Sequence, residues 1–147
     1  MSEILEMMES FIEIGNIKEL IIAFIIALPI GWNREKESRS MGLRTFPLVA
    51  VASCGYMLIG ASVAGNDPGA LSKMLYGLMT GIGFIGGGAI LKDGASVKGT
   101  ATAASIWNTG AVGAAVAFHR YEIAVVLAVI SFLILSLAKP IKDKITD

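Results

Sequence analysis

The stretch TFPLVAVASCGYMLIGASVAGN, residues 45–66, decides the fold class, because none of its 22 residues carries a charge. Three more uncharged stretches follow, at residues 74–91, 99–118 and 123–138. A helix needs roughly 20 mostly apolar residues to cross the hydrocarbon core of a bilayer. A soluble domain would need charges on its outer face, and these stretches supply none. The sequence therefore predicts an integral membrane protein and excludes a soluble enzyme or a nucleic-acid-binding domain.

The composition of the whole chain points to the same class of protein. Of its 147 residues only 16% are charged, and the mean hydropathy is +0.70, whereas soluble domains average about 25% charged residues. A shorter apolar segment near the N-terminus completes the set, with the long side chains of Lys18 and Glu19 expected to extend toward the headgroups. We expect an all-α, polytopic membrane helical bundle that forms a single domain over residues 1–147. The five predicted spans are residues 17–32, 44–64, 74–92, 99–118 and 121–138.

Basic residues are unevenly distributed between the predicted loops. Nine of the twelve Lys and Arg residues lie in the connections 33–44 and 92–98 and in the tail after residue 138. Short loops rich in Lys and Arg stay in the cytoplasm, so we expect the N-terminus outside and the C-terminus in the cytoplasm. Ahead of the first span, Glu6, Glu9 and Glu13 share one helical face. This pattern is typical of an interfacial helix, with a frayed terminus as the alternative.

Small residues concentrate in the second, third and fourth predicted spans, whereas the fifth consists mostly of large aliphatic residues. Small side chains four positions apart, such as Gly77 and Gly81 or Gly83 and Gly87, let helix backbones approach closely in a membrane. We therefore expect the third and fourth spans to form the packed centre and the fifth to face lipid. The same faces favour self-association, with a homodimer preferred.

The run GIGFIGGG, residues 81–88, looks like a dinucleotide-binding fingerprint, but that motif needs a preceding strand and a soluble helix. Two interpretations remain open: close helix packing, or a locally unwound helix beside a polar cavity. Asn108 in the next span is expected to hydrogen-bond to a neighbouring helix or to line such a cavity. The candidate cavity or packing residues are Gly81, Gly83, Gly86, Gly87, Gly88, Thr102, Ser105, Trp107 and Asn108.

A second candidate site is a polar cluster at the predicted cytoplasmic ends of the spans. Anchoring by positive charge explains its basic residues but not Asn33 or Glu35, so we expect hydrogen bonds and ion pairs that fix the loops. Magnesium in proteins keeps several waters and binds one or two carboxylates. Asp93 and Glu35 alone are weak evidence for such a site, so the sequence does not establish whether the cluster binds a metal. The cluster comprises Asn33, Arg34, Glu35, Arg44, Thr45, Asp93 and Lys98.

The sequence offers no catalytic arrangement and no zinc-ligand spacing, and we expect the spans to contain no ionisable residue of the kind that pumps and coupled transporters use. His119, without a clustered partner, is interpreted as a residue of the membrane interface rather than a metal ligand or a proton relay. We therefore expect neither an enzyme nor a bound cofactor.

Four segments resemble the MgtC/SapB membrane domain in order and spacing. They are Gly31-x-x-Arg34-Glu35, Gly42-Leu-Arg44-Thr45, Gly81-Ile-Gly83-Phe-Ile-Gly86-x-Gly88 and Val97-Lys-Gly99-x-x-Thr102-Ala-Ala-Ser105-Ile-Trp107. The resemblance implies a bacterial or archaeal inner-membrane protein, here without the cytoplasmic ACT-like domain that some members carry. Better-studied relatives support growth at low magnesium and survival inside macrophages, and are linked to inhibition of the rotary ATP synthase. This chain departs from them at Ala101 and Asn108, which puts their specific activity in doubt.

Two functions are therefore predicted. The first is a non-enzymatic membrane regulator, linked to magnesium limitation or to envelope and ATP homeostasis, that binds a membrane partner such as the rotary ATP synthase. The alternative is a small-ion transporter or channel with a cavity at the glycine-rich third span, since broken helices often hold the substrate of transporters.

Overall fold

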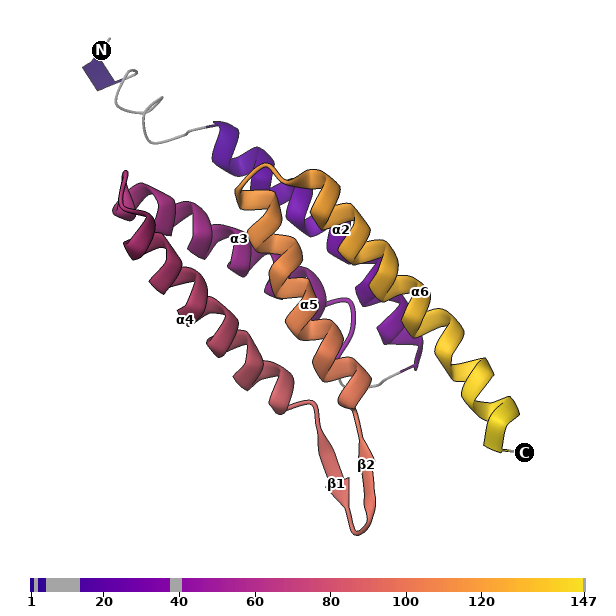
Figure 1. The fold of residues 1–147 in the computed structure, drawn as a ribbon. Coiled ribbons are helices and arrows are strands. Elements are labelled where there is room, and N and C mark those ends of the chain that lie inside the picture. Colours follow the sequence, from indigo (N-terminus) through magenta and orange to yellow (C-terminus); the bar gives the residue numbers. More distant parts are fainter. Residues whose placement is uncertain (2, 5–13, 38–40, 147) are drawn as a thin grey trace.

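The computed structural model describes residues 1, 3–4, 14–37 and 41–146. Over these residues it is an all-helical bundle, as predicted, with one short hairpin (Figure 1). The predicted interfacial segment with Glu6, Glu9 and Glu13 lies outside the described residues. The elements are α2 (Ile14–Glu37), α3 (Thr45–Ala64), α4 (Pro68–Gly87), β1 (Leu91–Asp93), β2 (Ser96–Lys98), α5 (Thr100–Ala117) and α6 (Tyr121–Thr146).

The five helices run alternately up and down, so that the chain enters at one end of the bundle and leaves at the other (Figure 1). The hairpin and the C-terminal end of α6 lie at the end opposite the N-terminus. The hairpin pairs β1 with β2 in antiparallel register, with Lys92 opposite Val97, in the connection between the third and fourth predicted spans. Gly99 then starts α5 at a φ of 86°, and a Cβ there would collide with the carbonyl oxygen of Ala89.

Helix α4 begins and ends earlier than its predicted span, residues 74–92. It begins at Pro68 because the Asp67 side chain accepts a hydrogen bond from the Gly69 N–H at 2.8 Å, and proline is favoured in the first helical turn. It ends at Gly87, inside the run of three glycines. The search for uncharged residues missed this start because Lys73 interrupts the helix.

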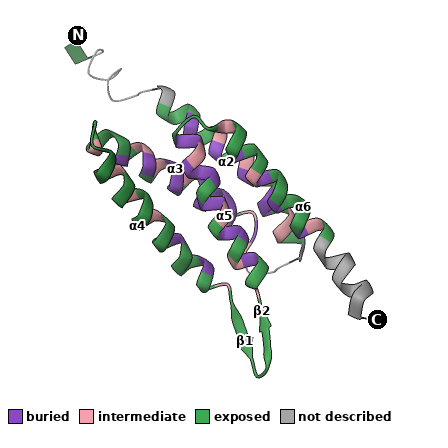
Figure 2. Ribbon diagram, viewed as in Figure 1, coloured by how far each residue is buried: buried purple, intermediate pink, exposed green. Residues whose placement is uncertain are grey.

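Helix α5 is the centre of the bundle and contacts α2, α3, α4 and α6. Ten of its 18 residues are buried (Figure 2). Its closest approach is to α3, where a Cβ on Gly113 would collide with the carbonyl oxygen of Ala50. The prediction that the third span also belongs to the packed centre is wrong, because only Ile82 and Gly86 of α4 are buried. Small residues indicate that a helix can pack closely but not which partner it packs against.

Two described helices are long and apolar enough to cross a membrane, at residues Asn16–Lys36 and Thr45–Ala64. The apolar part of α6 is shorter, Tyr121–Leu137. Glycine and hydroxyl side chains lower the hydropathy of α4 and α5, although both helices are as long as a typical span. Many large apolar side chains of α6 point outward, among them Val126, Ile130 and Ile134.

Candidate functional site

The predicted polar cluster divides into separate contacts at the end of the bundle that carries the hairpin. Asn33 of α2 donates from Nδ2 to Ser136 Oγ of α6 at 2.8 Å, while its buried Oδ1 has no hydrogen-bond partner among the described residues. Glu35 accepts the backbone N–H of Leu43 at 2.9 Å, and its side chain leaves no room for a Cβ on Gly42. These contacts tie α2 to α6 and to the start of α3.

The other members of the cluster lie apart from these contacts. Arg34 is half-buried on α2, and Thr45 is the first residue of α3, preceded by the exposed Arg44. Asp93 and Lys98 are exposed on the hairpin, which projects beyond the helices (Figure 1). Neither is joined to Glu35 or Arg44 by a hydrogen bond or ion pair among the described residues. The structure therefore does not bring the seven predicted residues together.

The glycine-rich run contains no internal break, because α4 is continuous to Gly87 and simply ends there. Gly86 is buried where α4 crosses α5, with a Cβ position 3.0 Å from the carbonyl oxygen of Ala103. Gly88 is the C-terminal cap of the helix. The helix therefore stops where the sequence favoured a break, but it ends there instead of continuing beyond an unwound turn. The run serves helix packing at Gly86 and helix termination at Gly88.

Ser105 and Asn108 of α5 form hydrogen bonds within the bundle. Ser105 Oγ donates to the carbonyl oxygen of Ala101 at 2.6 Å, and Thr102 is buried in the first turn of the helix. Asn108 Nδ2 donates to Ser131 Oγ at 2.6 Å and to the carbonyl oxygen of Leu127 at 3.1 Å. The Asn108 amide thus joins α5 to α6.

Grooves between helices of the described bundle include three that no charged side chain lines. One of about 410 Å³ lies between α3 and α4 and is lined by Gly81 and Ile82 among others. One of about 290 Å³ lies between α2 and α6, and one of about 230 Å³, lined by Trp107, lies between α4 and α5. Neither Asn108 nor Gly86–Gly88 lines any of these grooves.

Helix α4 presents an exposed face that none of the other described helices covers. We call it the outer face of α4, and it consists of Tyr76, Thr80, Gly83, Phe84 and Gly87. Tyr76 and Phe84 are 73% and 87% exposed. No atom lies within 4 Å of a Cβ built on Gly83 or Gly87. The face therefore combines two glycines, open to close approach, with two projecting aromatic rings.

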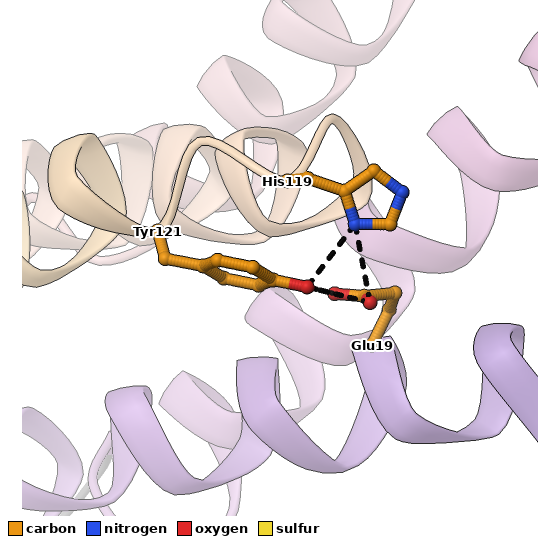
Figure 3. A network of polar contacts seen from close by, with 3 residues as sticks. All are labelled: Glu19, His119 and Tyr121. Carbon is orange, nitrogen blue, oxygen red and sulfur yellow. Dashed lines mark hydrogen bonds and ion pairs between the residues drawn. The ribbon is translucent and has the colours of Figure 1, made fainter.

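A polar network at the opposite end of the bundle was missed by the sequence analysis (Figure 3). Glu19 of α2 is only 3% exposed, so the expectation that its side chain extends toward the headgroups is wrong. Tyr121 Oη lies 2.7 Å and 2.8 Å from the two carboxylate oxygens of Glu19. His119 Nδ1 lies 3.3 Å from Glu19 Oε1 and 3.1 Å from Tyr121 Oη.

This network also corrects two statements about ionisable residues. His119 does have clustered partners, and Glu19 lies within one of the two helices that could span a membrane. No local sequence pattern predicts the contact, because Glu19 and Tyr121 are 102 positions apart in the sequence. Among the described residues, no three His, Cys, Asp or Glu side chains gather as a metal site.

Comparison with known proteins gives a consistent picture. A model of the MgtC family matches residues 20–144. The chain is 32% identical to Protein SrpB of Synechococcus elongatus, over 80% of this chain and 71% of that protein. It is 34% identical to the "Putative magnesium transporter YhiD" of Escherichia coli K12, over 79% of this chain and 57% of that protein. It is 29% identical to Protein MgtC of Salmonella typhimurium, over 84% and 52%. The matched region is thus little more than half of YhiD and MgtC, and no solved structure matches significantly.

Proposed function

The chain belongs to the MgtC family, and we propose that it is a non-enzymatic membrane protein that acts by binding another membrane protein. Its role belongs to the response to limiting magnesium or to envelope and ATP homeostasis. Its place is the cytoplasmic membrane, crossed by all five helices, with the N-terminus outside. The two long apolar helices and the outward-pointing aliphatic side chains of α6 support the membrane location.

The outer face of α4 carries the proposal of a binding function. Each glycine in a helix costs about 1 kcal/mol relative to alanine. Gly83 and Gly87 incur this cost without a packing gain among the described residues, since no atom of another described element lies within 4 Å of their Cβ positions. In a membrane, close approach at such positions is a main source of helix association. The face is therefore suited to a helix of a partner protein or of a second copy of this chain.

The test is association in mild detergent, measured by cross-linking and by co-purification from the host membrane. Gly83→Leu fills the outer face of α4, whereas Val126→Phe enlarges a similarly exposed position on α6 and serves as the matched control. We expect Gly83→Leu to abolish the association and Val126→Phe to preserve it. Recovery of neither a partner nor a dimer from the wild type contradicts the proposal, as does equal loss in both variants.

The physiological arm of the proposal is tested in a deletion strain grown at limiting magnesium. We expect deletion to change membrane potential or cellular ATP, the wild-type gene to restore it, and the Gly83→Leu gene to fail. Unchanged membrane potential and ATP after deletion argue against the regulatory role. If the Gly83→Leu gene restores membrane potential and ATP at normal protein levels, the regulatory role does not depend on the outer face of α4.

A small-ion transporter is the alternative, and the name of the YhiD relative, which calls it a magnesium transporter, favours it. The grooves of the single chain give it little support, because apolar side chains dominate their lining. Purified protein in liposomes distinguishes the two functions. Flux of magnesium, sodium, potassium or protons above that of empty liposomes favours transport, and its absence favours the binding function.

A further inference from the structure

The network of Glu19, His119 and Tyr121 places a buried carboxylate beside an exposed imidazole (Figure 3). The Glu19 side chain is 3% exposed and that of His119 is 68% exposed, yet His119 Nδ1 and Glu19 Oε1 are 3.3 Å apart. The three residues come from α2, from the turn between α5 and α6, and from the first residue of α6. They lie at the end of the bundle opposite the hairpin.

A carboxylate removed from water is costly unless a cation or several hydrogen-bond donors compensate it. The described contacts of Glu19 are one phenol hydroxyl, which has a single hydrogen for two oxygens, and one imidazole nitrogen. A neutral imidazole with its hydrogen on Nδ1 can donate to the carboxylate but brings no positive charge. One additional proton, on the other ring nitrogen of His119 or on Glu19, removes the uncompensated negative charge.

The surrounding charges do not replace this proton. Arg120 and Glu122 are exposed and pair with each other at 2.6 Å. Lys18, on the same helix as Glu19, is exposed. The thiol of Cys54 on α3 is near enough to interact electrostatically with Glu19 but brings no positive charge. Helix α5, which also packs against α2, contains no titratable side chain.

The backbone at His119 fixes where the imidazole lies. Its φ is 56°, and the N–H of Arg120 donates to the carbonyl oxygen of Ala115 at 2.9 Å, which is the common left-handed end of a helix. This turn at the end of α5 places the imidazole against Glu19.

We propose that Glu19, His119 and Tyr121 form a proton-binding site, in which the exposed imidazole exchanges protons with water and shares one with the buried carboxylate. In the transfer, the N–H bond at His119 Nδ1 breaks and an O–H bond forms at Glu19 Oε1. The imidazolium becomes neutral imidazole and the carboxylate becomes a carboxylic acid, so the charge of the pair is unchanged. Loss of the proton to water leaves the buried carboxylate with neutral hydrogen-bond donors and no positive charge, which weakens the contact of α2 with the start of α6.

The experiment uses the only histidine of the chain as its reporter. Protein with ¹⁵N-labelled imidazole is placed in lipid nanodiscs, and its two ring-nitrogen signals are followed from about pH 4 to about pH 9. The wild type is compared with Glu19→Gln, which keeps the shape of the side chain, and with Tyr121→Phe. Glu122→Gln removes a carboxylate three residues from His119 that does not contact the imidazole, and is the matched control.

An opposite charge in contact with a titrating group changes its proton affinity by about tenfold or more. We expect Glu19→Gln to weaken proton binding by at least that factor, seen as a lower titration midpoint. Tyr121→Phe removes the hydroxyl that competes with the proton for the carboxylate. It is therefore expected to strengthen proton binding, seen as a higher titration midpoint. Glu122→Gln is expected to change it by less than about twofold.

A titration of Glu19→Gln that coincides with that of Glu122→Gln overturns the proposal. If Glu19→Gln does not fold, Tyr121→Phe decides the question alone. A midpoint moved upward supports the site, and a midpoint equal to that of the wild type or below it refutes the site.

Discussion

Replacing Gly113 by alanine tests whether α5 packs against α3 backbone to backbone. The new Cβ would collide with the carbonyl oxygen of Ala50 and lie 2.9 Å from Ser53 Cβ, where ordinary contacts are 3.4–4 Å. These atoms cannot rotate away as a flexible side-chain end can, so the two helices must separate. Overpacking of this kind costs about 1–3 kcal/mol, whereas alanine gains up to about 1 kcal/mol in a helix. We expect a net loss of about 1–2 kcal/mol.

Two other glycines provide graded controls for this prediction. A Cβ on Gly110 would meet the flexible end of the Ile82 side chain, and one on Gly83 would meet nothing within 4 Å. We therefore expect stability to fall in the order Gly83→Ala, Gly110→Ala, Gly113→Ala, with Gly83→Ala at or above the wild type. The assay is reversible unfolding in mixed detergent micelles. Equal stability of Gly113→Ala and Gly83→Ala would refute the close contact of α3 and α5.

Three further substitutions test individual contacts of the fold. Asp67→Ala removes the N-cap of α4 and is expected to lower the free energy of unfolding by about 0.5–2 kcal/mol. Asp67→Asn, measured in the same micelles, should retain most of the stability that the cap contributes. Gly99→Ala forces a side chain into the left-handed region against Ala89, and faster amide hydrogen exchange in the hairpin and first turn of α5 is expected; unchanged exchange would contradict the geometry. Asn108→Leu removes the bond to Ser131 and is expected to cost about 0.6–1.7 kcal/mol, with no additional loss when Ser131→Ala is combined with it.

The helical class of the fold could be predicted because long uncharged runs leave few alternatives to membrane helices. The two ends of α3 illustrate this, since the predicted span 44–64 differs by one residue from Thr45–Ala64. Helix α4 was less predictable from its charge pattern. Its start depends on Asp67 and Pro68, which lie outside the uncharged run, and glycine spacing does not indicate that the outer face of α4 lacks a partner among the described residues.

The candidate sites were less predictable, because their contacts join residues far apart in the sequence. The amide of Asn33 was expected to serve the loop next to it, but its partner is Ser136 on α6. Glu19 and His119 were each interpreted from their immediate neighbours, which place both at a membrane interface. Only the packing of α2 against α6 shows that one is buried and that the other touches it.

The side of the membrane on which each loop lies provides the most direct test of the overall account. The chain has one cysteine, the buried Cys54, so a Cys54→Ala background leaves no native thiol. Single cysteines are introduced as Asn66→Cys, in the turn between α3 and α4, and as Ala95→Cys, at the tip of the hairpin. A membrane-impermeant thiol reagent on intact cells is expected to label the first and to spare the second until the cells are opened. Labelling of both cysteines, or of the hairpin cysteine alone, in intact cells would contradict a five-helix crossing with the hairpin in the cytoplasm. Recovery of the folded chain in detergent-free buffer would contradict it as well.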